Sequence, residues 1–254
     1  MEIIEINEKN IDGEHICCAL GGDKDNTRRA LSKKEWMKAN FKNGLIFRRS
    51  GERGKVFIEF MPVEKSWKPV SGKNIMLINC LWVSGKFKGK GLSGELLNNC
   101  IATTKKEKKD GIAVVTASKT MPFLTDKNLY EKFGFVPVDK APPYFELMFL
   151  KLNAAAKNPS FNSNAKTGLC SNKKGFTIIY SSQCPFMDEY VTITAGEIKK
   201  RKIQCEVIKL DSYKQAQETG SPFGTLGIYY KGEFKTHELM PDSRLNVFLD
   251  NTIK

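Results

Sequence analysis

The chain has 254 residues, of which 41% are hydrophobic, and a formal net charge of +13. This length suffices for a sizeable core and favours two domains, since one domain usually takes about 100–200 residues. No apolar run reaches the roughly 18 residues that a membrane-spanning helix requires, and residues 1–10 lack the basic-then-apolar order of a signal peptide, so neither membrane insertion nor secretion is expected. The odd number of cysteines, seven, favours reduced thiols in the cytoplasm over a disulfide framework.

The positive charge is uneven along the chain. From Met1 to Lys151 there are 27 Lys and Arg against 18 Asp and Glu, and from Leu152 onward 14 against 10. Such an excess favours anionic partners, namely phosphorylated small molecules, nucleic acid or an acidic membrane surface. Solubility alone is the alternative explanation for the charge.

The first part of the chain alternates strand-like and helix-like segments. Strands are indicated by β-branched and aromatic residues bounded by Gly and Pro, and a helix by apolar residues that recur on one face from Leu92 to Thr104. The strand–helix–strand order predicts a parallel pair of strands joined by a helical crossover. In chain order we expect strands 55–63 and 74–83, a helix from residue 92, strand 111–118, a short helix at 126–134 and strand 144–152.

A polar segment, residues 153–175, divides the chain. It is rich in Asn, Ser, Ala and Lys, which predicts a linker or a connection draped over the surface. After it the pattern indicates a β-α-β unit followed by β-β-α. The sequence therefore predicts an α/β (α+β) protein with domains 1–152 and 176–254. The elements expected in the second domain are strand 176–182, helix 185–202, strand 205–211, hairpin 224–234 and helix 241–253.

Residues 86–93, KFKGKGLS, combine closely spaced lysines with glycines just ahead of the predicted helix. Like charges repel at this density unless an anion lies among them. A turn of this kind presents the first backbone N–H groups of the helix, which have no partners within it, and the helix dipole adds partial positive charge. Glycine lets the backbone come close to an anion. The stretch therefore predicts a phosphate site, and we favour a pyrophosphate.

The segment VSGKFKGKGLSGELL, residues 83–97, resembles the acetyl-coenzyme A loop of the GNAT N-acetyltransferase superfamily, whose motif is Arg/Gln-x-x-Gly-x-Gly/Ala. Two registers fit, 86–91 and 88–93, and we prefer the second because the two leucines that follow then match the paired apolar residues of the family's helix. In that register Lys88 replaces Arg/Gln and Ser93 replaces Gly/Ala. The resemblance implies a GNAT-type mixed sheet with helices on both faces and acetyl-CoA as cosubstrate. It implies cofactor contacts from Leu81, Trp82, Val83, Lys86, Phe87, Lys88, Gly89, Lys90, Gly91, Leu92 and Ser93.

A second motif, LYEKFGF at residues 129–135, resembles the family's later Tyr-x-x-x-Gly-Phe. The resemblance implies that Tyr130 acts as general acid for the departing thiolate. An aromatic anchor on an amphipathic helix is the alternative for an isolated tyrosine, but the two motifs follow one another in the family's order. Phe123 stands where many relatives carry an asparagine.

The reaction implied by this resemblance also needs a base, because a primary amine must be neutral to attack a thioester. The candidate bases are Glu59 and Glu64, on or just beyond the strand 55–63. We favour Glu59, since strand alternation places it on the face opposite Ile58 and Phe60. The oxyanion would be stabilised by a backbone N–H from the end of the next strand.

Four further stretches and the attached second domain resemble the YoaP-type acetyltransferases over nearly the whole chain. This resemblance implies an acyltransferase (EC 2.3.1.-) that moves the acetyl group of acetyl-CoA to a primary amine by direct attack on the thioester. We expect a small-molecule or peptide amine as acceptor and neither a membrane nor nucleic acid as partner; the oligomeric state stays open. The four stretches are EHICCAL, IEFMPVEKSW, INCLWVSGKFKGKG and APPYFELMFLKL.

The second domain begins with YSSQCPFMDEY, residues 180–190, which resembles the active-site turn of the thioredoxin fold. Cys184 would lie at a helix N-terminus, where thiols gain reactivity. Met187 occupies the place of the second cysteine, and Gly224 the place of the cis-proline. Cys184 is therefore a candidate single reactive thiol, and the alternative function is a thiol-dependent oxidoreductase or thiol-binding protein.

Two further functions, metal binding and nucleic-acid binding, have little support in the sequence. Residues 13–20 gather His15 with Cys17 and Cys18, but adjacent cysteines rarely chelate one ion, so no metal site is expected; the segment predicts a buried helix or strand, with His15 a minor candidate for the acceptor pocket. A nucleic-acid binder would need aromatic residues interleaved with the lysines on an exposed sheet, and Phe87 alone provides one.

Overall fold

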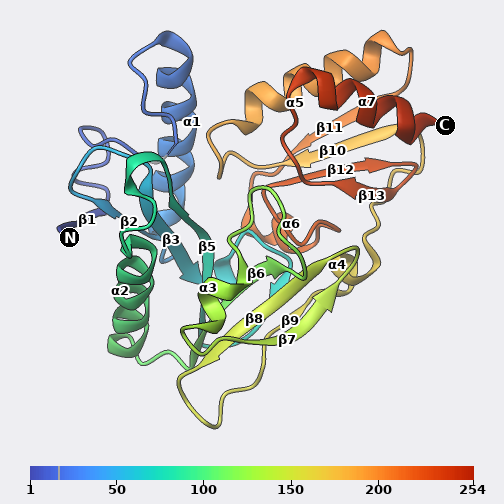
Figure 1. Cartoon of the computed structure of the whole chain (residues 1–254). Coiled ribbons are helices and arrows are strands. Elements are labelled where there is room, and N and C mark those ends of the chain that lie inside the picture. The colour runs from blue at the N-terminus through green and yellow to red at the C-terminus, as the bar shows by residue number, and fades with distance from the viewer. Residues whose placement is uncertain (17) are drawn as a thin grey trace.

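The computed structural model describes residues 1–16 and 18–254, and in these residues the first 151 positions contribute one mixed sheet of seven strands (Figure 1). The strands lie in the order β1-β2-β3-β5-β6-β8-β7. β5 and β6 are parallel and joined by the crossover helix α2 (Leu92–Lys106), and the other neighbouring pairs are antiparallel. The strands are β1 (Ile3–Ile6), β2 (Ile46–Ser50), β3 (Val56–Pro62), β5 (Ile75–Val83), β6 (Gly111–Ala117), β7 (Val136–Ala141) and β8 (Phe145–Lys151).

Helices cover both faces of this sheet, as strand alternation requires. Ile58 and Phe60 of β3 pack with Leu96 and Leu97 of α2 on one face. On the other face Phe57 of β3 lies in a second cluster, which α1 (Lys24–Phe41) enters with its buried tryptophan and methionine, Trp36 and Met37. A short helix, α3 (Lys127–Glu131), precedes β7. The expected mixed sheet with helices on both faces is confirmed.

The sequence pattern found the strands and helices of the sheet centre and missed its first edge. β1, α1 and β2 were not predicted, and neither was β7. α1 is difficult to recognise because charged residues and asparagines fill more than half of its length, so its apolar periodicity is weak. Its start is nevertheless locally encoded: the Asp23 side chain accepts the backbone N–H of Asn26 at 2.9 Å as an N-cap.

A second sheet follows, of four strands in the order β11-β10-β12-β13 within the described residues. β10 and β11 are parallel, whereas β12 is antiparallel to both β10 and β13. Figure 1 shows α5 and α7 together on one side of this sheet. All six elements expected in this half are confirmed, and α6 (Tyr213–Gln217) is added. Their bounds are β10 (Phe176–Tyr180), α5 (Met187–Lys200), β11 (Cys205–Lys209), β12 (Leu226–Tyr230), β13 (Glu233–Thr236) and α7 (Asp242–Ile253).

The segment between the sheets is packed. Within it β9 (Ser160–Phe161) pairs with β4 (Val70–Ser71), and α4 (Ser163–Thr167) follows directly. Phe161 and Ala165 are buried. A surface connection was expected here, and the residues that hold it down are the few apolar ones in an otherwise polar stretch.

One hydrophobic cluster extends through both sheets. It contains Phe145 and Phe149 of β8 together with Phe176 and Tyr180 of β10. The two sheets therefore share one apolar core. Among the described residues, no helix has both the length and the apolar character needed to cross a lipid bilayer.

Candidate active site

The parallel strands β5 and β6 separate partway along their length. Their pairing covers Ile75–Ile78 of β5 and stops there, although β5 continues to Val83. At the same point the β3–β5 register shifts between Glu59 and Phe60, so that Asn79 is an extra residue on β5. The end of β5 thus leaves its neighbour and presents one backbone edge to an opening in the sheet.

The direction of this free edge follows from one hydrogen bond. Thr125 Oγ1 donates to the carbonyl of Leu81 at 3.0 Å, from the side away from β3. Because N–H and C=O of one residue in a strand point the same way and alternate from residue to residue, the amides of Leu81 and Val83 face the opening and that of Trp82 faces β3. Ser84 donates to Lys55 of the β3 side at 3.1 Å, which fits this alternation.

Directly after β5 the chain forms the glycine loop, residues 84–91. Gly89 and Gly91 both have φ of +75°, a conformation that glycine adopts without strain, and the space where side chains would stand is open. Gly91 is the N-cap of α2 and offers it no side-chain hydrogen bond. Among the residues that the structure describes, none is recorded as accepting a hydrogen bond from the amides of residues 89–93. These donors fit an external anion.

The side chains of the loop divide into two groups. Lys86 forms an ion pair with Glu52, and the ring of Phe87 is buried against Gly54 in the core. These two residues therefore have partners within the chain, and only their backbone remains for a cofactor. Lys88 and Lys90 are exposed beside the free amides. This division favours the register 88–93 over 86–91.

Tyr130 lies in the core and is 1% exposed. Its hydroxyl is hydrogen-bonded with Thr125, the residue that also contacts Leu81. Burial raises the pKa of Tyr130 well above its usual value, so the phenol stays protonated at neutral pH. Through Thr125 the hydroxyl is connected to Leu81 near the end of β5, and Tyr130 itself is not among the residues that line the neighbouring cavity.

Glu59 is fully buried on β3, on the face opposite Ile58 and Phe60, as predicted. Its carboxylate forms an ion pair with the buried Lys33 of α1. Asn79 Nδ2 donates to Glu59 Oε1 at 3.1 Å, and Gln183 Nε2 donates to the same oxygen at 2.7 Å. The carboxylate is thus held by three different segments of the chain.

A cavity of about 190 Å³ lies above this carboxylate. Residues of the first sheet and of α1 line one side of the cavity. The turn before α5 and the residues that lead into β12 line the other side. Its walls are largely aromatic and aliphatic. The lining residues are Cys18, Lys33, Lys55, Phe57, Glu59, Asn79, Cys80, Trp82, Phe123, Gln183, Cys184, Pro185, Phe186, Met187, Phe223, Thr225 and Leu239.

Not every candidate from the sequence reaches this cavity. Glu64 accepts the backbone N–H of Asn74 at 2.6 Å and stabilises a turn instead. His15 is absent from the lining, and burial together with the charges of Arg49 and Arg53 lowers its pKa to about 4. The helix or strand expected at 13–20 is wrong for its described residues, which form turns and irregular backbone; Cys17 lies outside the described residues.

Cys184 does line the cavity, in the turn between β10 and α5. Met187, in the place of a second thiol, is fully buried. Within the part of the chain that the structure describes, no group of His, Cys, Asp and Glu side chains is arranged to hold a metal ion.

Sequence reasoning missed Lys33, Asn79 and Gln183, which all bind Glu59. Gln183 sits beside Cys184 in the resemblance to the thioredoxin turn, but nothing local indicates that it reaches another sheet. Asn79 could have been suspected as the polar residue in the middle of an apolar strand. Lys33 is one of several lysines on α1 and carries no local signal.

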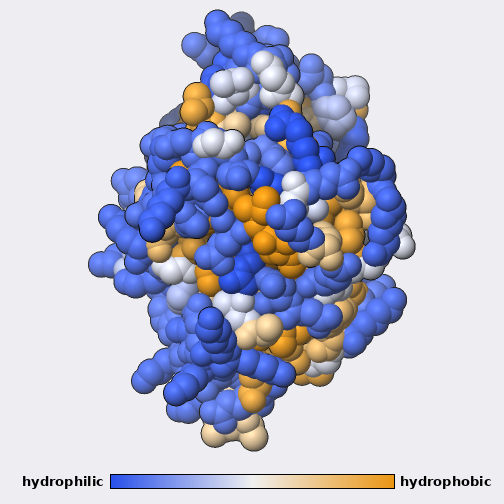
Figure 2. Space-filling view, turned by 90° about the vertical axis from the view of Figure 1, so that its left-hand side faces the viewer, coloured by the Kyte–Doolittle hydropathy of each residue, from blue (hydrophilic) through white to orange (hydrophobic). Residues whose placement is uncertain are grey.

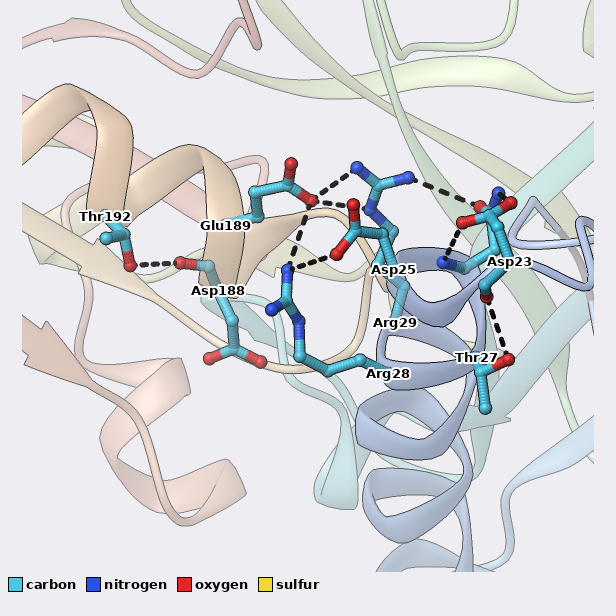
Figure 3. A network of polar contacts seen from close by, with 9 residues as sticks. Asp23, Asp25, Thr27, Arg28, Arg29, Asp188, Glu189 and Thr192 are labelled. Carbon is cyan, nitrogen blue, oxygen red and sulfur yellow. Dashed lines mark hydrogen bonds and ion pairs between the residues drawn. The ribbon is translucent and has the colours of Figure 1, made fainter.

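Side chains near the N-terminal ends of α1 and α5 contact one another (Figure 3). Arg29 Nε donates to Glu189 at 2.6 Å, and Arg28 lies 3.9 Å from the same carboxylate. One turn further along α1, Ser32 Oγ donates to Asp188 at 2.7 Å. Arg29, Ser32 and Lys33 follow helical spacing, so one face of α1 contacts both α5 and Glu59.

A second contact between the sheets surrounds His237. Its Nδ1 accepts from the Tyr144 hydroxyl at 2.9 Å, and its Nε2 donates to the Pro122 carbonyl at 3.1 Å. The ring packs on Phe145 and Phe223, 5.3 and 4.6 Å away between centroids. Burial is the main cause that lowers the pKa of His237 to about 4.

The chain is similar to several known acetyltransferases. Residues 204–246 match the family described as YoaP-like. The chain is 40% identical over 247 residues, 97% of its length and 98% of the relative's, to the Bacillus subtilis protein named "Uncharacterized N-acetyltransferase YoaP". Among solved structures, the ribosomal-protein-S18-alanine N-acetyltransferase of Escherichia coli is 14% identical with a TM-score of 0.41, covering 62% of this chain and 97% of that one. A GNAT family acetyltransferase of Brucella melitensis in complex with acetyl-CoA is 16% identical with a TM-score of 0.39, covering 64% and 96%.

Proposed function

The chain belongs to the YoaP-like family of GNAT N-acetyltransferases, and we propose that it transfers the acetyl group of acetyl-CoA to a primary amine by direct attack on the thioester. The observation that carries this proposal is the separation of β5 from β6 after Ile78, between the glycine loop and the buried Glu59. It leaves an edge of unpaired backbone that leads from an anion site to a carboxylate.

The glycine loop would hold the cosubstrate by its diphosphate. The free amides of residues 89–93 and the dipole of α2 support this role, and Lys88 and Lys90 add charge beside them. Lys86 and Phe87 would contribute through their backbone. Acetyl-CoA supplies the activated acetyl group, and its thioester would lie along the end of β5, Leu81–Val83.

The catalytic roles fall on Glu59 and Tyr130. Glu59 would accept the proton that the ammonium must lose, directly or through a water molecule, before the neutral nitrogen bonds to the acetyl carbon. The amide of Leu81 or Val83 would stabilise the oxyanion that forms. When the carbon–sulfur bond breaks, the hydroxyl of Tyr130 would donate its proton to the thiolate and recover one that the nitrogen of the intermediate, now positively charged, gives up. Glu59 forms a buried ion pair with Lys33.

Binding and turnover can be tested separately. Isothermal titration calorimetry with acetyl-CoA, at low salt, should give a 1:1 complex whose affinity falls as salt rises. A panel of amines, assayed by release of free CoA thiol, should then reveal an acceptor. Failure of acetyl-CoA to bind would refute the proposal, whichever amines were offered.

For the second half of the chain we propose a thioredoxin-like domain, 176–254, joined by the segment 153–175 to the acetyltransferase domain, 1–152. The strand order β11-β10-β12-β13 with a β-α-β start supports it. Its presence is also why thiol chemistry at Cys184 stays an alternative: this cysteine lines the same cavity. If the alternative held, Cys184→Ser would remove the fastest phase of the reaction with 5,5′-dithiobis(2-nitrobenzoate) and leave the slower reaction of the other partly exposed cysteines. The cytoplasmic location stays a prediction.

A further inference from the structure

The second half of the chain contributes to the cavity that Glu59 lines, both with Gln183, which binds Glu59, and with part of the apolar wall. We propose that the turn before α5 and the start of β12 complete the acceptor site: Gln183 positions the Glu59 carboxylate, and the aromatic walls select a primary amine carried on an apolar, ring-sized body. This inference rests on the proposed acetyltransferase function and names its acceptor class.

The role of Gln183 follows from its two hydrogen bonds. Its Nε2 donates to Glu59 Oε1 at 2.7 Å, and its Oε1 accepts from Thr225 Oγ1 at 3.3 Å. Gln183 and Thr225 are both 5% exposed. Because Thr225 can donate only to the oxygen of the amide, it fixes which end of the side chain faces Glu59. The second sheet thereby supplies one of the two donors to Glu59 Oε1, with Asn79 as the other, while Lys33 pairs with Oε2.

The apolar character of the acceptor follows from the walls. Five of the lining residues are aromatic: Phe57 and Trp82 from the first sheet, Phe123 from the loop before α3, and Phe186 and Phe223 from the second half. Met187 and Leu239 add aliphatic surface. An apolar cavity of about 150 Å³ holds one benzene ring, so a cavity of about 190 Å³ suffices for a ring with a short chain.

The charges of the cavity argue against polycations. Among the described lining residues the carboxylate is that of Glu59, which is already paired with Lys33, and Lys55 also lines the space. A diamine or polyamine would bring its second ammonium close to these lysines or bury it against aromatic walls without a carboxylate. A monoamine has no second charge to accommodate.

Figure 2 shows that, on the face it views, apolar groups gather near the middle and hydrophilic ones surround them, so apolar surface is locally concentrated on this protein.

The acceptor class is tested with two probes of opposite kind, 2-phenylethylamine and 1,4-diaminobutane. We expect kcat/KM for 2-phenylethylamine to exceed that for 1,4-diaminobutane at least tenfold, measured by CoA thiol release. Phe186→Ala should raise KM for 2-phenylethylamine severalfold without changing the Kd of acetyl-CoA. Phe248→Ala, on the half-buried face of α7 outside the cavity, is the matched control and should change neither. Equal or better use of the diamine would overturn the proposed class.

The positioning role is tested by Gln183→Leu, with Gln217→Leu as control. Gln217 also joins the two halves, through hydrogen bonds of 3.2 Å to the carbonyls of Val63 and Ser66, but it does not touch Glu59. We expect Gln183→Leu to lower kcat about tenfold and to move the acidic limb of the pH–rate profile to higher pH, since a carboxylate that loses a donor keeps its proton more readily. Gln217→Leu should leave that limb in place. If the acidic limb of the pH–rate profile stayed in place in both variants, Gln183 would only support the fold.

Calorimetry separates this inference from the function on which it rests. Binding of acetyl-CoA without binding or turnover of 2-phenylethylamine would remove the acceptor class alone. Binding of 2-phenylethylamine without binding of acetyl-CoA would remove the acetyltransferase function and leave an apolar amine site.

Discussion

The glycine loop and the acceptor cavity are two halves of one proposed site, yet they are assembled differently. In the loop, all of the groups proposed to bind the anion lie within residues 86–93, and most of them are backbone amides. In the cavity, Glu59 and its partner Gln183 are 124 positions apart, and α1 supplies the ion pair. A site made from consecutive backbone tolerates side-chain change, whereas a site made from buried charges depends on each partner.

The strongest test of this contrast is to break the ion pair in the cavity. Glu59→Leu leaves Lys33 buried without its carboxylate and should lower the free energy of unfolding by about 3–5 kcal/mol. The double variant Lys33→Met/Glu59→Leu should recover most of that loss, because no charge is then stranded. Urea denaturation measures both. A double variant as unstable as the single one would contradict this account of the pair.

Next in size is the effect of Tyr130→Phe, which removes the one buried hydroxyl proposed to act as general acid. Turnover should fall at least about a hundredfold, as expected for loss of a general acid, while the Kd of acetyl-CoA stays within about twofold. Single-turnover kinetics and calorimetry separate the two quantities. An equal loss of binding and turnover would assign Tyr130 to packing alone.

The contact around His237 predicts a pH dependence. The pKa of His237 is lowered from 6.5 to about 4 in the folded chain, so the unfolded chain takes up the proton first. Stability should therefore fall as the pH drops from about 6.5 to about 4, by up to about 1.4 kcal/mol per pH unit, and this contribution should level off below that range. His15, whose pKa is also lowered to about 4, is less buried and should add less. Urea denaturation at pH 7, 6 and 5 should show a shallower slope for His237→Gln; an unchanged slope would point to other groups.

Backbone changes in the loop should have smaller effects. Gly91→Ala forces a φ of +75° on a residue with a side chain, which should cost about 1 kcal/mol and weaken acetyl-CoA binding accordingly. Gly196→Ala is the matched control, since that glycine is exposed within α5 and has open space around it. It should instead raise stability by up to about 1 kcal/mol. Thermal unfolding and calorimetry compare the pair.

The smallest effect is expected from a single lysine of the loop. Lys88→Ala should raise the Kd of acetyl-CoA about three- to fivefold at low salt and less at high salt, because an exposed charge contributes at most about 1 kcal/mol and is screened. Lys106→Ala, at the opposite end of α2, should leave the Kd unchanged. If Lys88→Ala had no effect at any ionic strength, the backbone alone would account for the anion site.

The same contrast explains which parts of the fold and of the candidate site could be predicted from the sequence. The loop, the strands around it and Tyr130 were recognisable because their signals are local: glycine spacing, apolar runs and a short aromatic motif. The fold of the second half was likewise readable from its alternation of strands and helices. α1 was missed because its sequence is polar, although its N-cap Asp23 is a local signal.

The cavity could be anticipated only in part. Strand alternation was enough to choose Glu59 over Glu64 and to assign its face correctly. Its partners could not be found, because Lys33 and Gln183 come from elements whose contact with β3 depends on how the two sheets pack. Nothing in the local sequence indicates that Lys86 forms an ion pair with Glu52 or that the ring of Phe87 packs against Gly54.

The hydrophobic cluster that runs from β8 into β10 has a consequence for how the molecule can be divided. Truncation near residue 152 would expose Phe145 and Phe149 to water, so neither fragment should behave as an autonomous module. The intact chain should accordingly melt in a single cooperative step in a calorimeter, with the van't Hoff enthalpy matching the calorimetric one.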